Sequence, residues 1–239
     1  MNRRLGIAFL FVFVLGIVLV RQGPRETAAA PTSMGVTTLI SVNSSGAQGN
    51  NWSDDSAISA DGQLVVFRSP ASNLVPDDTN SAIDIFVRVS VDSSGTQANY
   101  GSYRPVISAN GRFVSFHSDA SNLVPNDTNG TWDVFIHDLQ TGTTIRASVN
   151  SSSVEGNRES VNPVLSEDGR FVAFFSSASN LVPEDNNNAA DVFVHDLETG
   201  TTTRASVDSS GVEGNNESTD PALSADGRFV AFESRASNL

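Results

Sequence analysis

The feature that most constrains this chain is an internal repeat. The segment Pro163 to Pro183, PVLSEDGRFVAFFSSASNLVP, recurs closely at Pro105–Pro125 and Pro221–Leu239, and more loosely at Ser56–Pro76. Successive Asx-Gly turns at 110–111, 168–169 and 226–227 are 58 positions apart, whereas the first turn, at 61–62, precedes the second by only 49. Self-similarity at such a period is typical of stacked repeat architectures, in which each unit buries its apolar surface against the next.

Each complete unit contains four short strand candidates bounded by turn residues. In one unit these candidates are Val164–Ser166, Arg170–Ser176, Asp191–Asp196 and Thr201–Val207. Asp-Gly between apolar runs and Thr-Gly between the last two candidates are hairpin signals, so the unit is predicted to be a four-stranded antiparallel meander. The first copy is nine residues short because one hairpin turn and its flanks are missing.

Both faces of the second strand of a unit are apolar. Val172 and Phe174 alternate with Phe171 and Ala173, a pattern that requires cover on both sides of the sheet. Stacking of one repeat on the next supplies that cover, as in the blades of a β-propeller. We therefore expect an all-β chain of about four 58-residue blades, with Phe113, Phe116, Phe229 and Phe232 filling layers between them.

The motifs S-x-DGRFVAF and DVFVHDLxTGTTxRAS resemble the WD40-like PD40 repeats of TolB-type β-propellers, over residues 37–239. The resemblance implies a propeller fold. Proteins of this kind serve as binding platforms, assembly partners or accessory domains of hydrolases, so it implies little about function.

Two interpretations of the blade count stay open. Thr37–Asn43, TTLISVN, matches the fourth strand Thr143–Asn150, TTIRASVN, and an N-terminal outer strand can close a propeller ring by completing its last blade. Alternatively, because Leu239 falls inside the fourth copy, the chain is a fragment of a longer array whose open strand edges favour self-association.

The N-terminus predicts export. Arg3 and Arg4 precede an apolar run from Leu5 to Val20 and the small residues Ala28–Ala30, the order found in secretory signal peptides. We assign 1–30 to this segment, with cleavage after Ala29, and 31–36 to a linker; an uncleaved membrane anchor is the alternative. The expected location is periplasmic, cell-surface or extracellular.

Composition excludes several classes of function. Residues 31–239 carry 10 Arg, no Lys and 26 Asp and Glu, a net charge of −16, which disfavours nucleic acid and anionic lipid. The chain has no cysteine, so disulfides, thiolate metal sites and a Cys nucleophile are excluded.

A repeated acidic loop follows each ASNLVP segment with the spacing D-x-N-x-x-x-D. Its carboxylate and amide oxygens suit Ca²⁺, although the loop lacks the Gly and the distant Glu of an EF-hand. The alternative is that the Asp and Asn residues form Asx turns and that the last Asp bonds a neighbouring backbone. The candidate ligands are Asp78, Asn80 and Asp84; Asp127, Asn129 and Asp133; and Asp185, Asn187 and Asp191.

No catalytic constellation is predicted. His137 and His195 occupy one repeat position, His117 aligns with Arg68, Phe175 and Glu233, and no G-x-S-x-G elbow is present. Loops such as Ser209–Ser218 between units could instead present hydroxyls and amides to a glycan or peptide. We therefore expect an exported, non-catalytic propeller that binds a protein or small ligand at its loop face; the alternatives are the accessory propeller of an exported hydrolase and a calcium-stabilised surface module.

Overall fold

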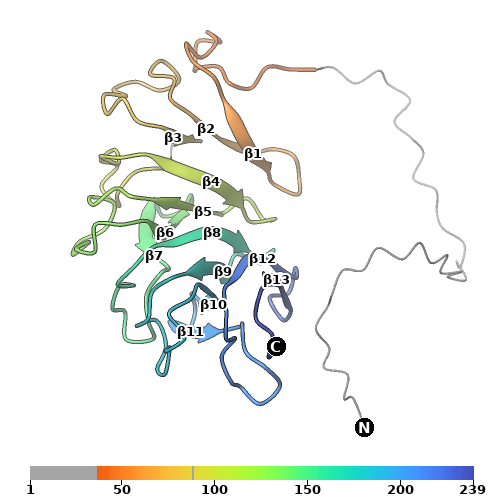
Figure 1. Ribbon diagram of the computed structural model, residues 1–239. Coiled ribbons are helices and arrows are strands. Elements are labelled where there is room, and N and C mark those ends of the chain that lie inside the picture. The colour runs from red at the N-terminus through yellow and green to blue at the C-terminus, as the bar shows by residue number, and fades with distance from the viewer. Residues whose placement is uncertain (1–36, 88) are drawn as a thin grey trace, which may run out of the picture.

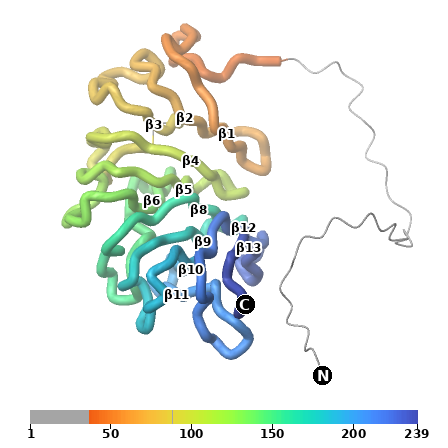
Figure 2. The backbone as a smooth tube through the Cα atoms, in the orientation of Figure 1, coloured from red at the N-terminus to blue at the C-terminus, as the bar shows by residue number. Residues whose placement is uncertain are grey.

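The computed structural model describes residues 37–87 and 89–239. The expected signal segment, the linker at 31–36 and Arg88 lie outside the described residues. No helix occurs in the described part of the chain, and the strands form four antiparallel sheets that follow one another along an arc (Figures 1 and 2). None of the described segments forms a helix with the length and apolar character of a membrane span.

The two middle sheets are the four-stranded meanders that the repeat predicts. The first of them has the order β4-β5-β6-β7 and the second β8-β9-β10-β11. Their bounds are Ser102–Ile107, Phe113–Ser118, Asp133–Asp138 and Thr143–Arg146 for β4 to β7, and Ser160–Leu165, Phe171–Ser176, Asp191–Asp196 and Thr201–Arg204 for β8 to β11.

The two outer sheets are smaller. The first, β1-β2-β3, consists of Asp54–Ile58, Val65–Ser69 and Asp84–Phe86, and the last, β12-β13, of Ser218–Leu223 and Val230–Ser234. In the first sheet the amide of Val89 bonds the carbonyl of Ile85 at 3.0 Å, so the chain turns away directly after β3. The missing nine residues therefore remove a hairpin turn and its flanks, as predicted, and the first sheet has no fourth strand.

Two strand boundaries differ from the sequence prediction. The first strand of a unit begins earlier, at Ser160 rather than Val164, because a bulge over Asn162 and Pro163 lets pairing continue to Ser160 opposite Ser176. The fourth strand ends at Arg204 rather than Val207. Beyond it, Ala205 bonds back to the carbonyl of Val192 at 2.7 Å, and Val207 makes only an isolated bridge to Glu213.

The ring is open in the described residues. Thr37–Asn43 does not form the predicted outer strand: it contains one end of an isolated bridge, Val42 to Gln48, and β13 has only β12 beside it. The first and last sheets lie at opposite ends of the arc (Figure 1). Closure of the last blade by Thr37–Asn43 was therefore the wrong interpretation, and the open array is the one that the structure shows.

The core lies between the sheets. One cluster joins Val66 and Ile85 of the first sheet to Phe116 of the second, and another joins Val134 of the second sheet to Phe174 of the third. The expected interblade layers are confirmed at these positions, because apolar faces of neighbouring sheets cover each other.

The aromatic layers are not equivalent along the arc. Phe116 is fully buried, and Phe113 packs against the turn of the next unit, where it approaches Gly169. Phe229 was wrongly assigned to such a layer: it is 66% exposed because no following sheet covers the face on which it lies. Phe232 is only half-buried for the same reason.

Candidate functional site

The nine predicted calcium ligands lie in three equivalent loops between the second and third strands of their units. In each loop the Asn side chain closes an Asx turn, as in Asn129, whose Oδ1 accepts from the amide of Thr131 at 3.0 Å. Its Nδ2 donates to Asp133 Oδ2 and to the carbonyl of Gly156, both at 2.9 Å. The same pattern holds at Asn80 and Asn187. Turn formation therefore uses the amide oxygen that the calcium hypothesis assigns to the ion.

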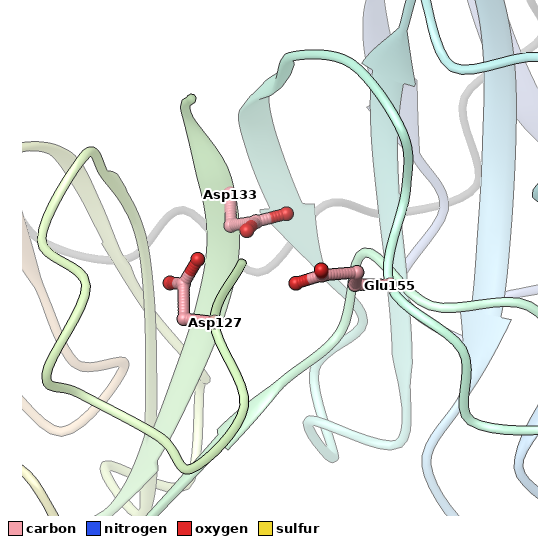
Figure 3. Close-up of side chains that lie close together, drawn as sticks. All are labelled: Asp127, Asp133 and Glu155. Carbon is pink, nitrogen blue, oxygen red and sulfur yellow. The ribbon is translucent and has the colours of Figure 1, made fainter. Parts of the chain in front are cut away.

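The structure adds two charged residues to each complete loop that the loop spacing alone did not reveal. Asp127, Asp133 and Glu155 point toward one another (Figure 3), and their oxygens lie within 4.8 Å of each other. Arg146 Nη1 lies 2.8 Å from Asp133 Oδ2, 2.5 Å from Glu155 Oε2 and 3.5 Å from Asp127 Oδ1. A guanidinium therefore already contacts the oxygens that would hold a metal ion.

The next unit repeats this arrangement, and the first unit has a glutamine in place of the glutamate. In the next unit Arg204 contacts Asp185, Asp191 and Glu213. In the first unit Gln97 replaces the glutamate, and its Nε2 bonds Asp78 Oδ1 and Asp84 Oδ2, each at 2.8 Å. Aligning the VEGN, TQAN and AQGN segments of the linking loops would have exposed this Glu-to-Gln exchange.

The groups around Arg146 and Arg204, here called the arginine clusters, each hold three carboxylates and one guanidinium. Burial, reinforced by the charges of Asp133 and Glu155 and opposed by that of Arg146, raises the pKa of Asp127 to about 6. Burial likewise raises the pKa of Asp185 to about 6. The excess negative charge is what a divalent cation would neutralise, so calcium binding at these loops stays a prediction.

Two of the three histidines serve the fold. His137 and His195 are buried, and their Nδ1 atoms lie 2.9 and 2.8 Å from the hydroxyls of Thr144 and Thr202. These threonines in turn bond the linking segment of the preceding unit, as Thr144 Oγ1 does with the carbonyl of Val91 at 2.5 Å. Both histidines therefore help to join neighbouring units.

One end of the sheets is nearly identical in the second and third units, which are complete. This constant end carries the Asx-Gly turns and the Thr-Gly turns, and ion pairs recur there between Arg112 and Asp138 and between Arg170 and Asp196, both at 2.7 Å. A cavity of about 580 Å³ opens between the second and third sheets at this end, lined by Phe113, Ile145 and Leu197 among others. Its walls consist largely of repeated framework residues.

The opposite end is where the copies differ. Three repeat positions change charge or polarity from unit to unit, and antiparallel pairing brings the first and third of them side by side in each sheet. We call this set the variable end: Asp54, Tyr103, Val161 and Thr219; Asp55, Arg104, Asn162 and Asp220; and Arg68, His117, Phe175 and Glu233.

Every Trp and Tyr of the chain gathers at or beside the variable end. Tyr103 stacks on His117 with ring centroids 6.0 Å apart, and Trp132 meets both rings edge-on at 5.3 and 5.4 Å. Trp52 and Tyr100, the residues just before the first strands of their units, are 47% and 56% exposed. The chain contains two Trp and two Tyr, so its large amphipathic aromatics are confined to this region.

A second cavity, of about 520 Å³, opens at the variable end across three units. Its walls are charged and polar, and Arg68 crosses from Asp54, 2.6 Å away, to lie over the rings of Trp52 and Tyr103. The lining residues are Asp54, Asp55, Arg68, Tyr103, Arg104, His117 and Asn162. From the sequence, the position of His117 is only variable among the copies, whereas the structure shows that the variable positions converge.

The solved structures to which this chain is similar include TolB proteins and the β-propeller domain of a protease. The chain is similar to TolB from Acinetobacter baumannii, with 18% identity and a TM-score of 0.43 over 79% of this chain and 39% of that one. It is also similar to a putative TolB from Agrobacterium tumefaciens, with 16% identity and a TM-score of 0.37 over 80% of this chain and 73% of that one. The β-propeller domain of the Trilobed protease from Pyrococcus furiosus has 17% identity and a TM-score of 0.32, over 54% of this chain and 33% of that one.

No protein-family model and no curated protein matches the chain. This chain spans about two fifths of the Acinetobacter TolB chain. The solved structures include TolB propellers, in agreement with the resemblance seen in the repeats, and the fold assignment rests on the sheets of this chain itself.

Proposed function

We propose that this chain is an exported, non-catalytic β-propeller that binds a protein or small ligand through its variable end. The observation that carries this proposal is the split between the two ends of the sheets. Residues needed for turns and blade packing repeat from copy to copy, whereas the residues that line the 520 Å³ cavity do not. Repetition maintains a scaffold, and departure from it at one place is expected where each unit contributes its own contact to a ligand.

The side chains at the variable end have the character of a binding surface. Trp, Tyr and Arg dominate the energetics of protein interfaces, and the two Trp residues, both Tyr residues, Arg68 and Arg104 are all found here. Backbone geometry supports the same assignment. Asp55, Arg104, Asn162 and Asp220 all have φ between 47° and 54°, and such left-handed conformations often occur at ligand sites.

The absence of cysteine provides a direct test. A single photoreactive label can be attached to Asn51→Cys, beside Trp52 at the variable end, or to Thr141→Cys, in an exposed turn at the constant end. The full-length chain is then irradiated in cell-envelope extract and the adducts are analysed by mass spectrometry.

We expect a discrete adduct from the Asn51→Cys label and none from the Thr141→Cys label. Equal adducts at both ends, or none at either, would refute the proposal. Adducts confined to the Thr141→Cys label would favour the alternative of an accessory propeller that packs against a catalytic domain.

A calcium-stabilised surface module is a second candidate, favoured by one observation. The clusters around Arg146 and Arg204 each hold three carboxylates against one guanidinium, with the pKa of one Asp raised to about 6. The metal dependence of the melting temperature distinguishes this candidate from a propeller that binds no calcium.

A further inference from the structure

The cavity at the variable end contains an arginine that forms no ion pair with the aspartates beside it. Among the described arginines, Arg104 and Arg158 form no ion pair, and only Arg104 of these two lines a cavity. The arginines that do form ion pairs are Arg68, Arg112, Arg146, Arg170, Arg204, Arg228 and Arg235. Arg104 makes no ion pair within the described residues, although it lies in a chain of strongly negative net charge and is exposed at the cavity. An exposed guanidinium in a concave site is a strong receptor for a carboxylate, because it offers two parallel donors.

The fold fixes the position of this guanidinium. Arg104 occupies the bulge of β4, where pairing with β5 shifts between Tyr103 and Val106, and its φ is 54°. A non-glycine residue is unfavourable in this left-handed region, so the surrounding sheet must hold it there. The same bulge places Asn162, from the next unit, in the same cavity.

His117 adds a neutral aromatic ring to the same wall. Its Nδ1 is shielded from solvent and has no hydrogen-bond partner among the described residues. Burial, followed by the charges of Arg104 and Arg68, lowers the pKa of His117 to about 4, so the ring is neutral at pH 7. The ring therefore adds no positive charge beside Arg104 and Arg68.

We propose that this cavity binds a hydroxylated sugar ring that carries one carboxylate, as in a uronic acid or the terminal residue of a short acidic saccharide. In this arrangement Arg104 pairs with the carboxylate, and Asp55 and Asn162 bond the hydroxyl groups. The sugar ring packs against Tyr103, an aromatic residue of the lining. The inference rests on the proposed function and names the chemical class of its ligand.

The cavity favours such a ligand over a peptide or a long polyanion. Its volume of about 520 Å³ suits a small molecule, and its mostly polar lining suits hydroxyl groups better than apolar side chains. The net charge of −16 over residues 31–239 repels a polymer of many carboxylates but permits a single carboxylate at Arg104.

Tryptophan fluorescence can test this proposal because Trp52 and Trp132 both lie at the variable end. The full-length chain, kept in mild detergent because of its apolar run Leu5–Val20, is titrated with glucuronate, galacturonate and their disaccharides. Glucose, the methyl ester of each uronate and a short acidic peptide serve as controls at constant ionic strength.

We expect a saturable change in emission with a uronate and a much weaker one with its ester or with glucose. Arg104→Gln should weaken uronate binding at least about tenfold, the loss expected when one charged hydrogen-bonding partner is removed. Arg228→Gln removes the same charge at the constant end and should leave the affinity unchanged. Asn162→Ala provides a second variant in the cavity, with a smaller expected loss.

Several results would overturn the inference. The first is an equal affinity of the protein for glucose and for uronate. The second is an Arg104→Gln variant that has the melting temperature of the parent and binds uronate with the same affinity. The third is a fluorescence change that saturates with the peptide but not with the sugars. If labelled Asn51→Cys still forms a discrete adduct while no sugar binds, the proposed function stands and the saccharide inference fails. If neither is observed, both fail.

Discussion

The contact between Phe113 and Gly169 should be the most sensitive point of blade stacking. Gly169 sits in the Asp-Gly turn of the third unit, and the ring of Phe113 from the second unit lies against it. A Cβ added at Gly169 would be 2.3 Å from Cδ2 of this ring and 2.9 Å from Cγ. Because Phe113 is also packed on the second hydrophobic cluster, its ring cannot simply swing away.

The cost of Gly169→Ala has two parts, and the chain offers a control that separates them. Gly142 has nearly the same φ, 72° against 75°, but a Cβ there would meet nothing within 4 Å. Gly142→Ala should therefore cost only the left-handed backbone penalty of roughly 1–2 kcal/mol. Gly169→Ala should add an overlap penalty of about 1–3 kcal/mol, for a total of about 2–5 kcal/mol.

Equilibrium urea unfolding, followed by far-UV circular dichroism and by Trp fluorescence, measures both variants. The first interface supplies a rescue, since Leu64 occupies the position of Phe113 and its Cδ1 would lie 3.0 Å from a Cβ on Gly111. Phe113→Leu should therefore reduce the cost of Gly169→Ala in a double-mutant cycle, with a coupling energy of about 1–2 kcal/mol. If Gly169→Ala costs no more than Gly142→Ala, Phe113 is not seated on this turn and the stacking argument is wrong.

Three further predictions follow from the burial and charge of single side chains. Phe116→Ala should cost about 3–5 kcal/mol of unfolding free energy, whereas Phe229→Ala, at the uncovered face, should cost less than about 0.5 kcal/mol; similar urea midpoints would contradict this difference. Millimolar Ca²⁺, but not Mg²⁺, should raise the melting temperature of the full-length chain over that in EDTA, by the equivalent of about 2.7 kcal/mol at a hundredfold excess over Kd, and Asp133→Ala should abolish the rise. A melting temperature that does not change with Ca²⁺ would show that these carboxylates pair with Arg146 and Arg204 and do not bind the metal. The pKa of His117 falls from 6.5 to about 4 on folding, so between these pH values the unfolded chain binds a proton that the folded chain does not. The free energy of unfolding therefore decreases as pH falls from 6.5 to about 4. His117→Phe, which copies Phe175 of the next unit, should therefore gain stability relative to the parent over that interval in pH-dependent urea unfolding, and parallel curves would show that His117 titrates normally.

The repeat made most of the fold predictable. Turn residues and apolar periodicity located the Asp-Gly and Thr-Gly hairpins, and the length difference in the first copy located its missing strand. The bulge within each first strand was missed because the predicted strand began only after Pro163, at Val164. In fact pairing resumes on its N-terminal side at Ser160 and Val161.

The candidate site was less predictable for a physical reason. Tyr103, His117 and Asn162 come from three strands, and only the antiparallel register and the stacking of units bring them together. Likewise, the spacing of the acidic loop identified Asp127 and Asp133 but not Arg146, which approaches them from the fourth strand of the same sheet. Contacts of this kind depend on tertiary pairing, which local spacing does not encode.

The hydrogen bonds that join successive turns give the arc a direction. The amide of Ala60 donates to the carbonyl of Ala109, that of Ala109 to Glu167, and that of Glu167 to Ala225, at 2.9 to 3.1 Å. The first sheet therefore presents the carbonyl of Ala60 near Gly62, where an added Cβ would meet no atom within 4 Å. The last sheet presents the amide of Ala225 near the exposed Phe229. These two surfaces are complementary to each other and not to themselves. Whatever lengthens the arc, whether a further repeat or a second copy, must join unlike ends, so growth is polar and produces a heterologous, head-to-tail contact rather than a two-fold dimer.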